Sequence, residues 1–70
     1  MVLTEITMTG GDRIKIDSDA RAVEAAILSA ARGSIMELAW MTDAQSGQRV
    51  GINPEYVVML RELDVDASPA

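Results

Sequence analysis

The side chains on which most enzymes and metal sites depend are missing from this chain. It contains no histidine and no cysteine, which removes the commonest general base, the thiol nucleophile and the preferred transition-metal ligands. Lys15 is the sole lysine, and its alternation with Ile14 and Ile16 points it toward solvent. The glycines lack the spacing of a phosphate-binding loop. We therefore predict no catalytic residue and a protein that is not an enzyme.

Two neighbouring carboxylates, Asp17 and Asp19, are the remaining candidates for acid–base work or for binding a hard cation. They precede a segment of helix-forming residues. There Asp17 or Ser18 would cap the helix, and Asp19 would face the positive end of its dipole. Capping explains both carboxylates, so we expect no metal site and no cofactor.

Trp40 and Tyr56 are the only aromatic residues. Trp40 is interpreted first as a core residue, with a subunit interface or a planar ligand as the alternatives. Tyr56 is expected to cover a sheet edge, and Arg49 suits an anion or a contact between subunits. The candidate residues for ligand or partner contact are therefore Trp40, Arg49 and Tyr56.

These residues need elements that position them, and the chain opens with two alternating segments. Residues 2–9 and 13–17 each alternate apolar and polar side chains, with Ile14 and Ile16 facing inward. Gly10 and Gly11 lie between them and accept positive φ, so we predict a hairpin with a two-residue turn.

Helix-forming residues, many of them alanine, follow from residue 19 to residue 32. Gly33 is a natural end to the helix. Apolar residues at helical spacing form a stripe of mostly small side chains, which lets the helix axis approach a sheet closely. The stripe consists of Ala20, Val23, Ile27, Ala30 and Ala31.

Residues 35–41 are predicted to form a strand with two apolar faces, as in a strand covered on both sides. A polar turn at 42–48 leads to another strand at 49–52. One face is formed by Met36, Leu38 and Trp40, and the other by Ile35, Ala39 and Met41.

The segment after Asn53 permits two interpretations. Asn53 could cap a short helix that has Pro54 at its first position, or Pro54 could form a single turn that leads into a strand. The alternation of Tyr56, Val58 and Leu60 favours the strand. Residues 64–70 are acidic and small, and we predict a disordered tail there.

The predicted fold is a single α+β domain over residues 1–63 with the order ββαβββ. One largely antiparallel sheet of four to five strands would carry the single helix on one face, in two layers. One helix covers one face of the sheet, so an apolar strand face remains without a partner. The predicted interface residues are Ile35, Ala39, Met41 and Met59.

Six basic and eleven acidic residues leave a net charge of −5. This balance disfavours nucleic acid and anionic membranes, which attract clustered Lys and Arg. The absence of cysteine, and a start without the regions of a signal peptide, favour the cytoplasm. We expect a cytoplasmic protein that binds neither nucleic acid nor membrane.

Size adds an argument for association. In a chain of 70 residues the hydrophobic gain only roughly balances the conformational entropy lost, and no disulfide or zinc site is possible. We therefore predict a non-enzymatic interaction module that forms a homo-oligomer and contacts a protein partner. Two alternatives stay open: a carrier that binds a flavin-like ligand between subunits, and an acidic regulator that occupies a basic site.

Three short motifs resemble a family of small actinobacterial proteins classed as a domain of unknown function. They are the acidic helix entry at residues 17–19, the Gly47-Gln48-Arg49-Val50 return, and Pro54 followed by Val57 or Val58 and Leu60. The resemblance covers about 55 residues and implies a bacterial intracellular setting and a fold, without an activity. A weaker likeness is to the dodecins, flavin-storing shell proteins, through residues 25–27, Trp40 and residues 55–57.

Overall fold

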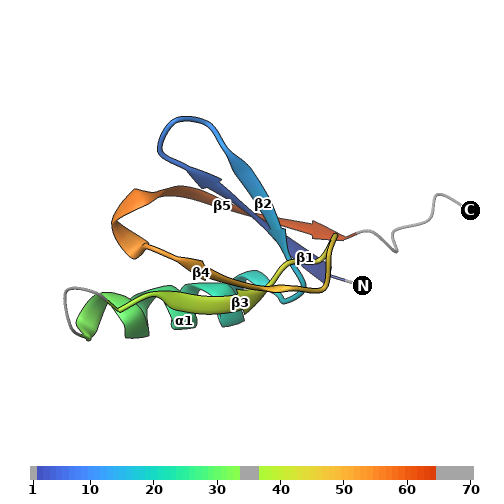
Figure 1. The fold of residues 1–70 in the computed structure, drawn as a ribbon. Coiled ribbons are helices and arrows are strands. Elements are labelled where there is room, and N and C mark those ends of the chain that lie inside the picture. The colour runs from blue at the N-terminus through green and yellow to red at the C-terminus, as the bar shows by residue number, and fades with distance from the viewer. Residues whose placement is uncertain (1, 34–36, 65–70) are drawn as a thin grey trace, which may run out of the picture.

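A computed structural model describes residues 2–33 and 37–64 (Figure 1). These residues form an α+β fold, which confirms the predicted class. The strand expected over 35–41 begins only at Ala39, and Ile35 and Met36 lie outside the described residues. In chain order the elements are β1 (Val2–Met8), β2 (Arg13–Ile16), α1 (Ala20–Arg32), β3 (Ala39–Thr42), β4 (Arg49–Ile52), the 3-10 helix η1 (Pro54–Tyr56) and β5 (Val57–Asp64).

The strands form two sheets, whereas a single sheet was predicted. One has three strands in the order β2-β1-β5, and the other is the β3–β4 hairpin; every pairing is antiparallel. One bridge between Ile16 and Asp43 joins them, flanked by the bond from the Ala44 N–H to the Lys15 carbonyl (2.8 Å). The sheet divides because β2 is four residues long and the chain then turns into the helix.

The first hairpin forms as predicted, with a loop one residue longer than expected. The Met8 N–H donates to the Asp12 carbonyl (2.7 Å) and the Gly11 N–H donates to the Met8 carbonyl (2.9 Å), which leaves residues 9–11 in the loop. Gly10 and Gly11 have φ values of 99° and 97°. Such values disfavour any residue with a side chain, which explains the glycine pair.

The start of α1 is held from two directions. Asp19, rather than Asp17 or Ser18, is the N-cap, and its Oδ1 accepts from the Ala22 N–H at 2.8 Å. Glu62 of β5 adds a second carboxylate, whose Oε1 accepts from the Ala20 N–H at 3.0 Å. Both carboxylates meet free N–H groups at the positive end of the helix, so the last strand and the helix stabilise each other.

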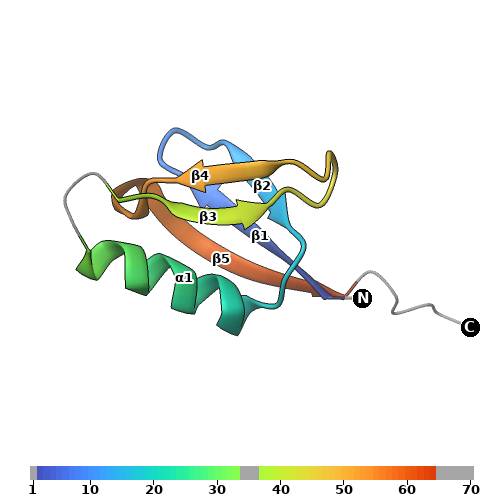
Figure 2. The same ribbon diagram turned by 60° about the horizontal axis from the view of Figure 1, so that its bottom comes forward.

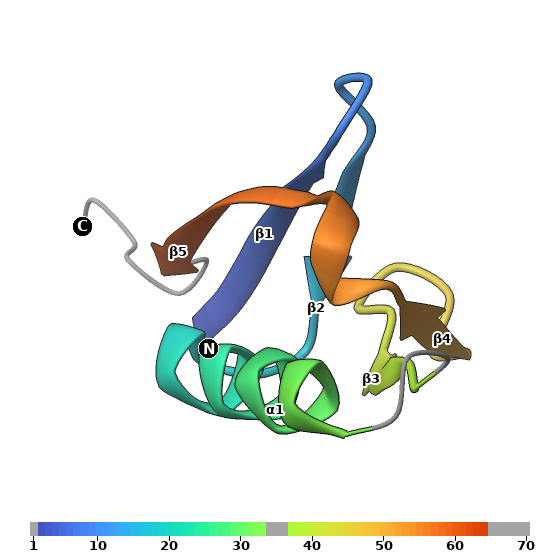
Figure 3. The same cartoon turned by 90° about the vertical axis from the view of Figure 1, so that its left-hand side faces the viewer.

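The helix lies across the inner side of both sheets. Figure 2 shows that α1 runs beside β3 and β5. In Figure 3, β1 and β2 lie above the helix, and β3 and β4 lie to its right. Val23 and Ala30 are the buried helix residues, whereas Ala31 of the predicted stripe is exposed. The buried apolar cluster consists of Ile6, Ile16, Val23, Ala30, Ala39, Met41 and Ile52.

The segment after Asn53 combines the two interpretations: a 3-10 helix of one turn, which includes Tyr56, leads into the predicted strand. Asn53 caps the turn, since its Oδ1 accepts from the Glu55 N–H at 3.0 Å, and Pro54 opens η1. The strand β5 then pairs with β1 along its length, from Met8 opposite Val57 to Val2 opposite Asp64. No helix in the described part of the chain is long and apolar enough to cross a membrane.

Candidate functional site

The β3–β4 hairpin has one face in the core and the other in solvent. Ala39 and Met41, two of the predicted interface residues, are 3% and 7% exposed and pack with Ile52 in the core. They belong to the interior of the single chain and offer no surface to a second copy. The apolar surface that stays exposed on this hairpin is the other face of the strand, that of Leu38 and Trp40.

Trp40 is 57% exposed, which corrects its interpretation as a core residue. The physical reason is the small size of the helix stripe. Alanine side chains bring α1 close to β3, and the space between them fits Ala39 and Met41 better than an indole. Alternation along the strand then directs Trp40 outward.

Gly51 lies directly opposite Trp40 in the register of the two strands. A Cβ at Gly51 would stand 3.1 Å from Trp40 Cη2, 3.2 Å from Trp40 Cζ2 and 2.9 Å from Leu38 Cδ1. The indole therefore lies over the backbone of β4, in space that a side chain would occupy. The Cζ2 and Cη2 atoms of the ring are thus close to β4, while more than half of the residue is exposed.

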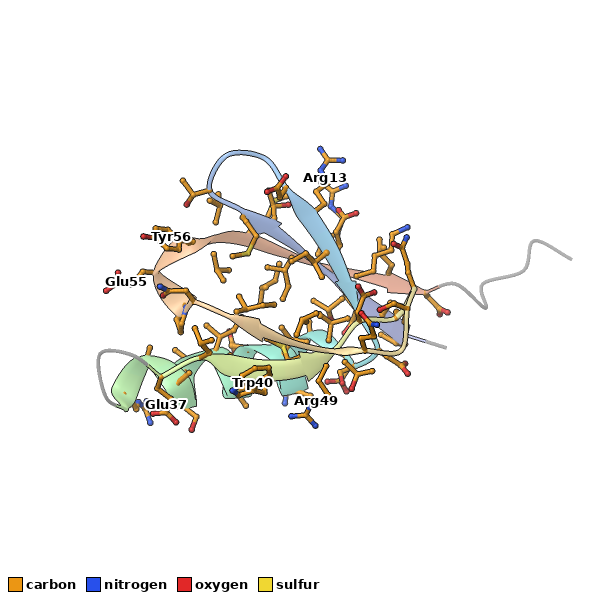
Figure 4. The ribbon with its side chains drawn as sticks, viewed as in Figure 1. Arg13, Glu37, Trp40, Arg49, Glu55 and Tyr56 are labelled. Atoms are coloured by element: carbon orange, nitrogen blue, oxygen red, sulfur yellow. The ribbon has the colours of Figure 1, made fainter. Side chains whose placement is uncertain are left out.

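Arg49 is on the same face of the hairpin, opposite Thr42 and two residues before Gly51. Figure 4 shows Trp40 and Arg49 projecting from one side of the molecule, while Tyr56 lies at the end formed by η1. We call the surface formed by Leu38, Trp40, Arg49 and Gly51 the Trp40 face.

Tyr56 and Met59 are exposed but belong to other surfaces. Tyr56 is 53% exposed, and its carbonyl accepts from the N–H (2.7 Å) and Oγ1 (3.2 Å) of Thr9 in the first hairpin loop. Met59 is on β5 opposite Thr7. The structure thus unites Trp40 with Arg49 but separates both from Tyr56 and Met59.

The outer edge of β4 has backbone groups without a strand partner among the described residues. The bond from the Asp43 N–H to the Gln48 carbonyl (2.8 Å) makes these two a hydrogen-bonded pair. Because such pairs alternate along an antiparallel ladder, Val50 and Ile52 bond to β3. The N–H and C=O groups of Arg49 and Gly51 therefore point away from β3, toward the free edge.

A pocket of about 280 Å³ opens between the last turn of α1 and η1. Its lining includes two acidic residues, Glu37 and Glu55. The end of the flexible Glu37 side chain lies where a Cβ on Gly33 would be, and Gly33 itself has an extended backbone with a φ of −82°. Across residues 2–33 and 37–64, no three acidic, histidine or cysteine side chains are grouped to hold a metal ion.

A second exposed face is the outer side of the three-stranded sheet. Glu5 of β1 lies between Lys15 of β2 and Arg61 of β5 in the register. Opposite charges at directly paired positions stabilise a sheet by about 0.2–1 kcal/mol each. These charges fit a solvated sheet surface and require no ligand.

No family model, no curated protein and no solved structure matches this chain. The resemblances to the actinobacterial family and to the dodecins therefore stay predictions. The residues that sequence reasoning missed are Leu38 and Gly51. A glycine inside a strand, facing an aromatic residue, is the signal that would have found the second.

Proposed function

We propose that this protein is a non-enzymatic interaction module that self-associates through the Trp40 face. The observation that carries the proposal is the exposed indole of Trp40, which packs against Gly51. An exposed tryptophan that the fold already holds in place loses little conformational freedom on binding, and tryptophan is enriched among residues that dominate interface energies.

A second copy is the partner that the composition favours. The small core leaves the single chain with little surplus stability, and contacts of a second copy with the Trp40 face would add apolar burial. The free edge of β4 adjoins the same face, so a second copy would contact both the backbone groups of the edge and the side chains of the face. The lack of cysteine supports a role in the cytoplasm.

Native mass spectrometry at low micromolar concentration tests this proposal. We expect a homo-oligomer for the wild-type chain, and a monomer for Trp40→Ala and Trp40→Glu. Tyr56→Ala is the matched control, because Tyr56 is an aromatic residue of similar exposure on another surface, and it should leave the mass unchanged.

Two results would contradict the proposal. A wild-type chain that stays monomeric up to high micromolar concentration would show that the protein does not self-associate. An oligomer that carries additional bound mass instead supports the carrier alternative, with Trp40 as the residue that stacks on the ligand.

A further inference from the structure

We propose that the second copy adds its own β4 to the free edge of β4, antiparallel, so that Arg49 of each copy lies against the partner's Trp40. This inference rests on the proposed self-association and specifies its geometry. The result is a continuous four-stranded sheet with the order β3-β4-β4-β3 around a two-fold axis. Such a pairing is closed, because each copy offers the same edge to the other.

The backbone supplies the first argument. Arg49 and Gly51 each direct an N–H and a C=O away from β3. Those groups form a template for another strand, and no strand of the described residues pairs with them. Water satisfies the groups in the monomer, and a strand would satisfy them in the dimer.

The register follows from which groups are free. Pairing Arg49 with the partner's Gly51 uses both residues of both copies and gives four backbone hydrogen bonds. Pairing Arg49 with the partner's Arg49 would place like charges opposite each other. Pairing Gly51 with the partner's Gly51 leaves only one such pair within the strands, since β4 ends at Ile52.

The side chains supply an independent argument for the same register. Arg49 of one copy would stand beside the partner's Gly51, over which the partner's Trp40 lies. A guanidinium within about 6 Å of an indole is attracted by the ring electrons, and tryptophan is the best such partner. The absence of a side chain at position 51 makes room for both groups.

Single-cysteine variants test the register directly, because the chain has no cysteine of its own. In this register Val50 lies on the two-fold axis, in a non-hydrogen-bonded pair with a Cα separation of about 4.5 Å. That distance permits a disulfide. We expect Val50→Cys to form a covalent dimer under mild oxidation. Gln48→Cys, exposed two residues before Val50 and directly before β4, is the matched control and should crosslink at least about tenfold more slowly, because the two Gln48 positions stand four residues apart in this register.

Two substitutions at position 49 distinguish the contribution of the backbone to dimerisation from that of the side chain. Arg49→Pro removes an N–H that makes no bond to β3, so the hairpin keeps its ladder, and the dimer should weaken at least about tenfold. Arg49→Ala keeps that N–H and loses the contact with the indole, which should weaken the dimer about fivefold. Circular dichroism confirms that each variant folds.

The outcomes distinguish the two proposals. A wild-type dimer in which Val50→Cys crosslinks no faster than Gln48→Cys would overturn the edge pairing and leave self-association standing. The same conclusion follows if Arg49→Pro dimerises as well as the wild type. A wild-type chain that is monomeric throughout would overturn both.

Discussion

Trp40 and Gly51 act as a pair in which the missing side chain of one makes room for the other. The indole covers the backbone of β4 at a non-hydrogen-bonded position, where opposite residues approach most closely. This cross-strand contact compensates for a residue that by itself weakens a strand. The glycine at position 51 is therefore explained by the packing of Trp40 on the hairpin surface and not by the backbone conformation of a turn.

We predict that Gly51→Val displaces the indole from the hairpin. The nearest ring atoms are 3.1–3.2 Å from the position of a Cβ, closer than ordinary contact, so the ring must move outward. Because Trp40 is the only tryptophan, its fluorescence emission reports this movement, and we expect a shift toward the red. Thr42→Ser, at the next outward position of β3, should leave the emission maximum in place. An unchanged spectrum in Gly51→Val would show that the indole does not depend on Gly51.

A second prediction concerns the helix cap. Asp19→Ala removes the acceptor of the Ala22 N–H and should lower the free energy of unfolding by about 1 kcal/mol. Asp17→Ala deletes the same charge two residues earlier and should have a smaller effect. Urea unfolding followed by circular dichroism measures both. Equal effects would mean that charge near the helix, and not the cap, stabilises it.

At the scale of elements, the contact between α1 and β5 joins segments that are distant in the sequence. Glu62 lies 42 positions after Ala20 and accepts from its N–H at 3.0 Å. Bonds that include a charged partner are stronger than neutral ones. The part of the stabilisation that comes from Glu62 therefore requires the last strand to be in place, whereas the Asp19 cap is local.

We predict that Glu62→Gln lowers the free energy of unfolding by about 0.5–1 kcal/mol, because the amide oxygen still accepts but the charge at the helix start is lost. Glu24→Gln removes the same charge from an exposed position in the middle of α1. Denaturant unfolding of the two variants gives the comparison. If Glu24→Gln is equally destabilising, the contact at Ala20 contributes nothing specific.

Most elements were predictable because their signals are local. Alternation identified β1 and β2, the glycine pair identified the hairpin, and alanine with Gly33 identified α1. The face of β3 was not predictable in this way, because Ala39 and Met41 are as apolar as Leu38 and Trp40. Only the space left by α1 decides between the two faces. The division into two sheets joined by a single bridge is likewise a property of packing, without a sequence signal.

For the whole molecule, association and stability are linked. A ligand or partner that binds only the folded state raises apparent stability by mass action. We predict that the thermal midpoint of the wild-type chain rises as protein concentration increases from micromolar to hundreds of micromolar. Trp40→Ala should remove this dependence, and Tyr56→Ala should retain it. Differential scanning calorimetry at several concentrations tests the prediction, and a midpoint independent of concentration in the wild type would contradict it.

The place of β1 between β2 and β5 has a consequence for synthesis of the protein on the ribosome. β1 needs β5, which is made much later, as its neighbour along its whole length. The hairpin and the helix emerge early, yet the second edge of β1 and the start of α1 wait for β5, which also adds Val57 and Leu60 to the core. Pairing of such distant segments is slow and leaves apolar surface open in the meantime. A nascent chain that stalls before residue 57 would thus present Ile6 and Val23 to chaperones instead of a finished fold.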